Sequence, residues 1–298
     1  MLQISNLSAG YKNREGYVEK IKDINIRIGE GEIVGIIGES GSGKTTLARA
    51  LAGELFRSNG DIYYDGESIF SKKNYFEFKK RRVYVRQESL NILRPKYSVE
   101  FQFKKLFKGG KYDSEKLRRI FAYLDLDMDI IKELPEKLSD GTKHRVVLAM
   151  ACLVEPEILI LDEPTTGLDF ESSLGLLKLL KEMKEHTSTL FLSNDVIPVF
   201  QICDRIYVMD NGMIVEDGVW DEILEKPHHP HTYDLVNYIP EFNNRNKKFV
   251  RTYNEVSGGC PSSKTCLHMR EVCKNEIDYS MDGDHSYRCI RYPGWLND

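Results

Sequence analysis

The segment "EIVGIIGESGSGKTTLARALAGEL", residues 32–55, decides the fold. It opens with a nearly continuous apolar run, which predicts a strand buried in a parallel sheet. "GESGSGKT", residues 38–45, then fits the G-x-x-x-x-G-K-[ST] pattern of a phosphate-binding loop, and a helical run follows. In such a loop, backbone N–H groups face the phosphates, the lysine adds positive charge and the hydroxyl binds Mg²⁺. The residues expected to contact nucleotide here are Gly38, Ser40, Gly41, Ser42, Gly43, Lys44, Thr45 and Thr46.

A second motif, "ILILDEPTTGLD" at residues 158–169, is an apolar strand that ends in two adjacent acids. At this position Asp162 can hold the water shell of the Mg²⁺ that Thr45 binds. Glu163 can reach a water molecule in line with the γ-phosphate and act as general base. The alternative, a strand followed by a solvated acidic turn, is disfavoured by the phosphate-binding loop in the same chain. The two motifs together predict a Mg²⁺-dependent ATPase.

Composition narrows the class of protein. The chain has 298 residues with 41% hydrophobic content, enough for one large domain with a small appendage. Its formal net charge is -4 and its pI about 6.0, which argues against a nucleic-acid partner. The N-terminus lacks the apolar run of a signal peptide, and no apolar stretch is long enough to span a bilayer. We therefore expect a cytosolic protein that can dock on a membrane protein.

Strand-like and helical patterns alternate along most of the chain. Strands are predicted around residues 24–28, 32–38, 83–85, 157–161, 188–192 and 205–209. With helical patterns between most of them, they indicate an α/β fold, a P-loop NTPase core with a largely parallel sheet. Only helical patterns occur at about 88–154, which predicts a helical subdomain inserted in the sheet domain. We expect an ATPase domain at 1–240, then a polar linker that includes residues 243–248 and a cysteine-rich tail, together 241–298.

The motifs and their order resemble those of a known family, the ATP-binding subunits of ABC transporters. The resemblance rests on "GESGSGKTT", "LSDGTKHRV" (138–146), "LDEPTTGLD" (161–169) and Gln87 in "VYVRQES", and it covers residues 2–240. "GESGSGKTT", "HPHTYDLV" (229–236) and the cysteine tail narrow it to the oligopeptide/dipeptide/nickel importer branch. The resemblance implies an ABC ATPase fold that binds and hydrolyses ATP with Mg²⁺.

The resemblance also implies roles for single residues. Tyr11, in "LSAGY", corresponds to the aromatic that stacks on adenine, and Tyr17 is the competing candidate. Gln87 would contact Mg²⁺, take part in catalysis and relay the nucleotide state to the helical region that grips the permease. Asp169 would belong to the loop that links two ATP sites across a dimer. Packing is the alternative role for the tyrosines.

The chain departs from the family pattern in the helix start "LSDG". The family usually has Leu-Ser-Gly-Gly, and this helix end reaches across a dimer to the γ-phosphate on the partner's loop. Ser139 and Gly141 can make that contact, but Asp140 lies beside them. Two unit charges about 5 Å apart at an effective dielectric near 20 repel by about 3 kcal/mol. The alternative is favourable, because an acid in the first turn of a helix gains about 0.3 to 1 kcal/mol.

A second departure is "FLSND", residues 191–195. The family expects a histidine at Asn194, where it holds the γ-phosphate and the attacking water. Asparagine can donate a hydrogen bond but cannot become a cation, which predicts slower turnover. In a composite dimer, Asn194 and Asp140 would fall at different sites. We therefore predict a heterodimer with a different ATPase subunit and two unequal ATP sites.

The tail contains four cysteines at Cys260, Cys266, Cys273 and Cys289. In a reducing compartment this spacing favours a metal over disulfides. The wide spacings and the importer branch favour a 4Fe-4S cluster over Zn²⁺, with free or paired thiols as the remaining alternative. His268 and His285 could substitute as ligands, with surface histidines preferred. His228, His229 and His231 are expected to form a structural turn.

The sequence thus predicts the ATPase subunit of a peptide- or nickel-type membrane importer. Its expected partners are a second ATPase subunit, transmembrane permease subunits and, indirectly, an extracellular solute-binding protein. Its expected location is the cytoplasmic face of the cell membrane. One alternative is a regulatory or structural subunit that binds ATP with little hydrolysis. Another is an ABC ATPase acting on ribosomes or DNA, which the single ATPase core argues against.

Overall fold

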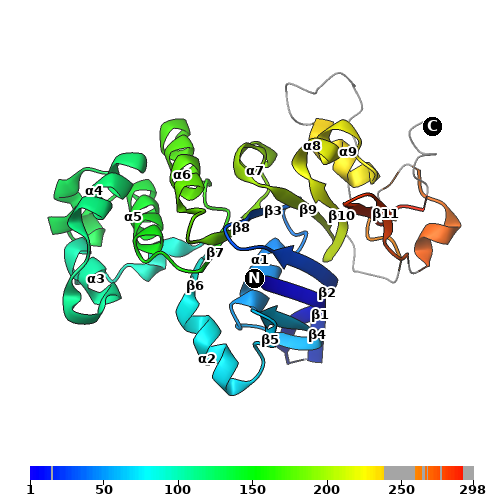
Figure 1. The fold of residues 1–298 in the computed structure, drawn as a ribbon, viewed down its shortest axis with the longest axis horizontal. Coiled ribbons are helices and arrows are strands. Elements are labelled where there is room, and N and C mark those ends of the chain that lie inside the picture. The colour runs from blue at the N-terminus through cyan, green and yellow to red at the C-terminus, as the bar shows by residue number, and fades with distance from the viewer. Residues whose placement is uncertain (15, 238–258, 264–265, 267, 276, 291–298) are drawn as a thin grey trace.

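The computed structural model describes residues 1–14, 16–237, 259–263, 266, 268–275 and 277–290. Its main sheet contains β3 (Ile33–Ile37), β6 (Arg82–Val85), β7 (Ile158–Asp162), β8 (Ser188–Ser193), β9 (Arg205–Asp210), β10 (Met213–Val219), β11 (Ser280–Asp282) and β12 (His285–Tyr287). The strand order is β11-β12-β10-β9-β3-β8-β7-β6 (Figure 1). In the part of the sheet with the order β9-β3-β8-β7-β6, each strand is parallel to its neighbours. The predicted α/β fold with a largely parallel sheet is confirmed.

The helices lie on both faces of this sheet. They are α1 (Lys44–Leu51), α2 (Lys72–Arg81), α3 (Val99–Leu106), α4 (Ser114–Tyr123), α5 (Asp140–Leu153), α6 (Phe170–Met183), α7 (Val196–Ile202), α8 (Trp220–Glu225) and α9 (Pro230–Asn237). Short 3-10 helices are η1 (Ser89–Ile92), η2 (Lys108–Gly110), η3 (Met128–Lys132), η4 (Pro135–Lys137) and η6 (Glu271–Lys274).

Successive side chains of the buried strands enter two different apolar cores, because side chains alternate between the faces of a strand. Along β3, Ile33 and Ile37 pack with residues of α5, α6 and α7. Val34 and Ile36 pack with α1 and with a second sheet on the opposite face. The apolar run that predicted this strand therefore serves both faces at once, and burial on both sides fixes where the loop after β3 begins.

The second sheet was largely missed in the sequence. It is antiparallel, with the order β2-β1-β4-β5, and it consists of β1 (Leu2–Asn13), β2 (Gly16–Ile28), β4 (Phe56–Tyr64) and β5 (Glu67–Ser68). Within this second sheet, the spacing of apolar residues predicted a strand only around residues 24–28. In β1 the pairing register with β2 shifts between Ile4 and Leu7 and again between Leu7 and Gly10, so the apolar residues do not alternate regularly.

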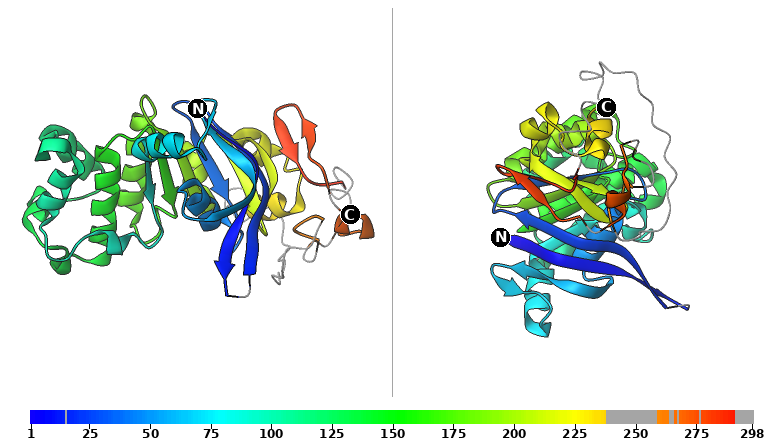
Figure 2. Two further views of the ribbon diagram at one scale, coloured as in Figure 1. Left: turned by 90° about the horizontal axis from the view of Figure 1, so that it is seen from below. Right: turned by 90° about the vertical axis from the view of Figure 1, so that its right-hand side faces the viewer.

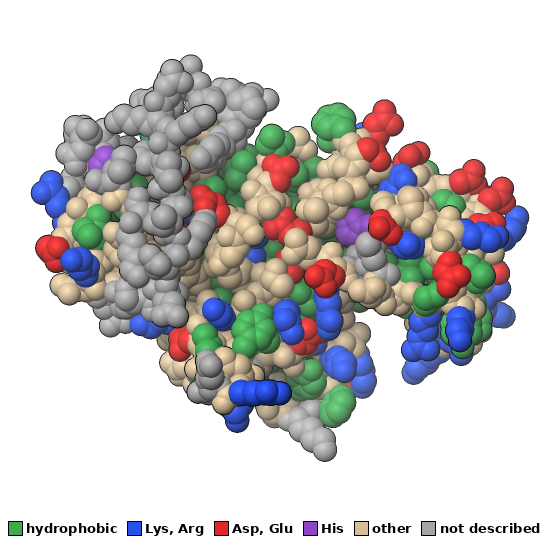
Figure 3. Space-filling view, turned by 180° about the vertical axis from the view of Figure 1, so that it is seen from behind, with side chains coloured by type: hydrophobic (Ala, Val, Ile, Leu, Met, Phe, Trp, Pro, Cys, Tyr) green, Lys and Arg blue, Asp and Glu red, His purple; other side chains and the backbone are tan. Residues whose placement is uncertain are grey.

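Helices α3, α4 and α5 gather at one end of the molecule, where a helical region was expected (Figure 1). Phe103 of α3 and Phe121 of α4 are fully buried there, and their ring centroids are 5.8 Å apart. Figure 3 shows acidic and basic side chains intermixed over this end on one face of the molecule. In the described ranges, no helix has the length and apolar character needed to cross a bilayer.

The C-terminal segment lies at the other end of the molecule (Figure 2). The sequence indicated a polar linker and a cysteine-rich tail without predicted strands, but β12 pairs antiparallel with β10 and thereby extends the main sheet, with Glu216 opposite Tyr287 and Asp217 opposite Ser286. Arg288 also forms an ion pair with Asp23 of β2. The linker expected at residues 243–248 lies outside the described residues.

Candidate functional site

The predicted phosphate-binding loop joins β3 to α1. Gly41 and Gly43 have φ values of +86° and +111°, which residues with a Cβ rarely adopt, and Gly43 is the N-cap of α1. The loop curls around the side chain of Lys44, whose Nζ donates to the carbonyl oxygens of Gly38 (2.8 Å) and Glu39 (3.1 Å). Burial lowers the pKa of Lys44. The lysine side chain is therefore held by carbonyl oxygens of the loop. To contact a phosphate, its Nζ would exchange these hydrogen bonds for phosphate oxygens.

Thr45 and Asp162 face each other across the sheet edge. The Thr45 hydroxyl donates to Oδ1 of Asp162 at 3.2 Å, and the Tyr84 hydroxyl donates to Oδ2 at 3.3 Å. Burial raises the pKa of Asp162. Two of the three predicted Mg²⁺-binding side chains, Thr45 and Asp162, thus lie together. Tyr84 had not been identified in the sequence, because a tyrosine in an apolar strand gives no sign of which face it occupies.

Glu163 is buried directly after β7. Its Oε1 lies 3.5 Å from Nζ of Lys44, and its Oε2 accepts from the backbone N–H of Asn194 at 3.1 Å. Its backbone has a φ of +53°, an uncommon value for a residue with a side chain. The Asn194 side chain is itself exposed. Parallel pairing of β7 with β8 therefore brings Glu163 and Asn194, two of the three predicted catalytic residues, together at one edge.

The expected aromatic contact also lies near this loop. The Tyr11 hydroxyl is 3.4 Å from Oγ1 of Thr46, and the Arg49 guanidinium lies 5.2 Å from the centre of the Tyr11 ring. Tyr17 is half-buried on β2, opposite Lys12 of β1. Gln87 is exposed two residues beyond β6, the strand next to β7. Tyr11 is thus the tyrosine in contact with α1.

The helix start "LSDG" is shaped by local interactions. Ser139 is the N-cap of α5, and its Oγ accepts from the backbone N–H of Thr142 at 3.1 Å. Asp140 is 75% exposed in side-chain area and pairs with Lys143, 2.9 Å from Nζ. A Cβ on Gly141 would lie 3.6 Å from the carbonyl oxygen of Gly167. In the single chain the acid is thus a solvated first-turn residue with a cationic neighbour, and its distance from a partner's nucleotide stays a prediction.

The loop after Glu163 links this helix start to the catalytic acids. Nε2 of His144, a buried residue of α5, lies 2.9 Å from the carbonyl oxygen of Pro164. Asp169 ends the loop as the N-cap of α6, and its carboxylate accepts from the backbone and the hydroxyl of Ser172 at 2.8 and 2.9 Å. These backbone and side-chain hydrogen bonds lower the pKa of Asp169. No sequence pattern identifies His144, since a single histidine in a helix usually has a packing role.

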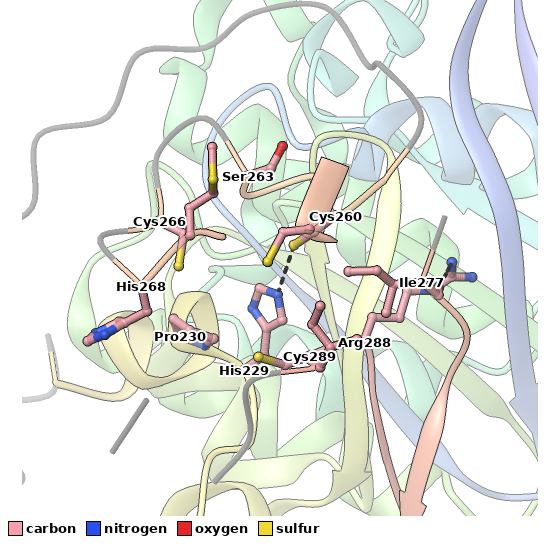
Figure 4. Close-up of a pocket in the computed structure, with 12 residues that line it drawn as sticks. His229, Pro230, Cys260, Ser263, Cys266, His268, Ile277, Arg288 and Cys289 are labelled. Atoms are coloured by element: carbon pink, nitrogen blue, oxygen red, sulfur yellow. Dashed lines mark hydrogen bonds between the residues drawn. The ribbon is translucent and has the colours of Figure 1, made fainter. Parts of the chain in front are cut away.

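The four tail cysteines lie around one pocket, although they are spread over 30 residues. Cys260, Cys266, Cys273 and Cys289 all line it, and none forms a disulfide. The pocket encloses about 330 Å³ that no atom fills, part of it open to solvent. His229 also lines it, with Nε2 3.6 Å from Sγ of Cys260 (Figure 4). Burial, with a smaller contribution from the other three thiols, raises the pKa of the Cys260 thiol to about 12.

The histidines near the pocket differ from the expectation. The predicted surface position of His285 is wrong. Its side chain is only 3% exposed, because it lies on β12 between β10 and β11. His268 lines the cysteine pocket and is half-buried. His228, His229 and His231 are buried at the start of α9, and the backbone N–H of His231 donates to Nδ1 of His229 at 3.1 Å.

The tail contacts the turn that supports the phosphate-binding loop. The Ser262 hydroxyl donates to the Asp210 carboxylate, and the Asn211 side chain donates to the carbonyl oxygen of Pro261 at 3.1 Å. In the same turn, the N–H of Gly212 donates to the carbonyl oxygen of Ser42 at 2.7 Å. The cysteine pocket and the phosphate-binding loop are therefore joined by a short run of hydrogen bonds.

Comparison with known proteins identifies the family. Residues 21–166 match the ABC transporter family. The probable D,D-dipeptide transport ATP-binding protein DdpD of Escherichia coli K12 is 30% identical over 97% of this chain and 95% of its own length. The oligopeptide transport ATP-binding protein OppD of Haemophilus influenzae is 31% identical over 92% and 91%. The dimeric structure of a bacterial ABC transporter cassette has a TM-score of 0.64 at 24% identity, over 74% of this chain and 99% of that chain. The chain therefore belongs to the ATP-binding subunits of ABC transporters and is an ABC-type ATPase.

Proposed function

We propose that this chain is an ATPase subunit of a membrane importer of the peptide or nickel type. The observation that carries the proposal is the meeting of Lys44, Thr45, Asp162 and Glu163 at the carboxyl ends of β3 and β7. In importers of this kind, ATP binding closes a dimer of two such subunits, and hydrolysis reopens it. The permease moves with the dimer. The relatives' names, which refer to dipeptide and oligopeptide transport, support this substrate class.

The residues fit the chemistry of ATP hydrolysis with Mg²⁺. The Thr45 hydroxyl and the Asp162 carboxylate are hard oxygen donors 3.2 Å apart, as Mg²⁺ prefers, and Gln87 would supply a third oxygen. When bound, the ion offsets the charge that develops on the phosphates. The loop N–H groups and Lys44 bind the phosphates, and Tyr11 stacks on the adenine. Glu163 accepts the proton of the attacking water.

We also infer that the subunit works in a heterodimer with unequal sites. Asn194 presents a neutral amide where the family has a histidine, so the site built on this chain's own phosphate-binding loop would turn over slowly. Asp140 would face the partner's nucleotide together with Ser139 and Gly141. Its pairing with Lys143 reduces the expected repulsion. The larger defect is therefore expected at the site that contains Asn194.

The test is ATP hydrolysis by the purified chain and by the complex isolated from its native membrane. We expect the chain alone to be nearly inactive and the complex to contain a second, different ATPase subunit by mass spectrometry. Asn194→His in the complex should raise kcat several-fold, whereas Asn237→His, a change at the end of α9, should leave it unchanged. Brisk hydrolysis by a homodimer would refute the heterodimer.

The helical region supports a contact with the permease at the cytoplasmic face of the membrane. Ile92, Tyr97 and Phe101 are 45%, 43% and 40% exposed there, and the rings of Tyr97 and Phe101 stack with centroids 4.7 Å apart. Exposed apolar groups next to one another often mark an interaction site. Gln87 lies in the connection that leads from β6 to this region, so a change in nucleotide state could reach it. The solute-binding protein would act through the permease.

We further propose that the four tail cysteines hold a metal centre, a 4Fe-4S cluster in preference to Zn²⁺. Four thiols on one pocket without a disulfide form a suitable donor set. Because the N–H of His231 occupies Nδ1 of His229, the ring proton of His229 lies on Nε2, facing Sγ of Cys260. His229 is thereby suited to donate a hydrogen bond to a thiolate and not to ligate the metal itself.

Anaerobic purification followed by iron, sulfide and zinc analysis tests the metal centre. We expect about four iron and four sulfide ions per chain with a brown colour. Cys289→Ser should abolish the colour, whereas Cys152→Ala, a change in the buried core of α5, should retain it. A colourless protein that holds zinc on sulfur would select the alternative metal, and a protein without either would refute the centre.

A further inference from the structure

A buried cluster of two imidazoles and one carboxylate lies beside the cysteine pocket and has no part in the proposed function. Glu216 comes from β10, His228 from the segment before α9, and His285 from β12. Their exposed fractions are 0%, 1% and 3%. Two residues 12 positions apart and a third 57 positions further along the chain thus bring polar side chains to one point inside the protein. Buried polar groups of this kind require partners that compensate for the loss of water.

The ligand atoms of the cluster are spaced as a metal would require. Oε1 of Glu216 lies 2.6 Å from Nε2 of His285 and 3.7 Å from Nδ1 of His228. The two imidazole nitrogens are 3.1 Å apart. Zinc bound tetrahedrally at 2.0–2.2 Å keeps neighbouring ligand atoms about 3.3 Å apart. The three separations bracket that value, so one ion could contact all three atoms after small side-chain movements.

Hydrogen bonding alone accounts poorly for this arrangement. Nε2 of His285 carries at most one proton, yet it faces both Oε1 of Glu216 and Nδ1 of His228. One proton cannot point at both acceptors with good geometry. Within the described part of the chain, the ion-pair partners of Glu216 are these two imidazoles. A divalent cation would accept a lone pair from each of the three groups and balance the buried negative charge.

The surroundings orient the cluster toward its centre. Nε2 of His228 lies 3.4 Å from Oδ2 of Asp282, which directs Nδ1 of the same ring toward Glu216. The backbone N–H groups of His228 and His229 donate to the two carboxylate oxygens of Glu216 at 2.6 and 2.9 Å. A carboxylate on the outer nitrogen of a ligating histidine is a common second layer of metal sites.

We propose that Glu216, His228 and His285 form a binding site for zinc or a similar divalent transition-metal ion. Two imidazole nitrogens and one carboxylate oxygen are a donor set that zinc accepts, with water as a fourth ligand. The ion would fasten β12 and the segment before α9 to β10 of the ATPase domain. This site differs from the cysteine pocket in its donors and does not depend on what the cysteines hold.

The test is metal binding to the full chain with Co²⁺ and Zn²⁺ as probes. We expect one Co²⁺ per chain with nitrogen and oxygen ligation and without a sulfur-to-cobalt charge-transfer band. His285→Ala and Glu216→Gln should abolish this binding, and Asp282→Asn should weaken it about tenfold. His186→Ala, a change of an exposed histidine elsewhere, should leave the affinity unchanged. Equal affinity in all variants would overturn the proposal.

A measurement on the unaltered chain covers the case in which these variants fail to fold. X-ray absorption of the zinc-loaded protein should show a nitrogen and oxygen shell at about 2.0 Å with the scattering pattern of imidazole rings. Zinc found in a sulfur shell alone would mean that the cysteines take the ion and that the cluster is a hydrogen-bonded contact. That result would refute the site while leaving the metal centre of the cysteine pocket intact.

Discussion

The catalytic edge and the tail region are assembled in different ways. The catalytic edge, defined by Lys44, Thr45, Asp162 and Glu163, lies on strands that two large apolar cores bury from both sides. The tail region, residues 259–290, has a small apolar cluster of Cys260, Cys273 and Ile277 and is attached largely by polar contacts. Apolar burial positions the first site without a ligand. The described residues of the tail region bury too little apolar area to be positioned in this way, and bound metals often contribute folding energy to such regions.

The largest expected effect tests the catalytic edge. In the assembled complex, Glu163→Gln should lower turnover at the site built on this chain's own phosphate-binding loop by about 10² to 10⁴, because a positioned general base contributes that much, and should leave ATP binding intact. Glu185→Gln, a change of an exposed acid on the same protein, serves as the control. Steady-state ATPase assays and nucleotide-binding titrations give both values. Little change in kcat would support the alternative of a regulatory subunit whose partner performs the hydrolysis.

The next largest effect separates the two regions. If the cysteines hold the proposed metal centre, Cys273→Ser should make the tail open about a hundredfold more often, because the loss of a ligand removes folding energy, while protection of the parallel strands stays constant. Hydrogen exchange resolved by segment measures this, and Val272→Ser, at an exposed neighbour, is the control. If the ATP affinity also falls, the two regions are coupled through the contact of Gly212 with Ser42.

A third change disturbs the scaffold of the catalytic edge. An added Cβ at Gly35 of β3 would lie 2.4 Å from Cγ1 of Val199 on α7, so Gly35→Ala should lower the free energy of unfolding by about 1–3 kcal/mol. At Gly29 the nearest atom, 3.1 Å away, is the end of the flexible Glu32 side chain, and Gly29→Ala should cost less than about 0.5 kcal/mol. Denaturant titration compares the two. Equal costs would show that the sheet and α7 can separate easily.

The smallest effect concerns the start of α5, which would face the partner subunit in the proposed dimer. Asp140→Gly should change kcat of the assembled complex by less than about threefold, because the acid is solvated and already pairs with Lys143. Asp127→Gly, at the N-cap of η3, provides a matched loss of an exposed acid. An increase of tenfold or more would mean that Asp140 repels the partner's nucleotide at close range after all.

Much of the catalytic edge could be predicted because its residues lie in short motifs. Lys44 and Thr45 are adjacent at the end of the loop that follows β3, and Asp162 and Glu163 are adjacent at the end of β7. Parallel pairing of these strands then brings their carboxyl ends to one edge. Tyr84 and His144 were missed because neither belongs to a pattern, and their contacts with Asp162 and Pro164 arise only when separate elements pack.

The sequence by itself determined the nature of the ATPase core, because the period of its apolar residues and the spacing of its glycines and acids reflect local backbone geometry. Only the tertiary structure decided that β12 joins the main sheet and that the four cysteines line one pocket. It also decided that Glu216, His228 and His285 meet. Contacts between segments so far apart depend on long-range docking, and a single sequence carries no local period or spacing that specifies them.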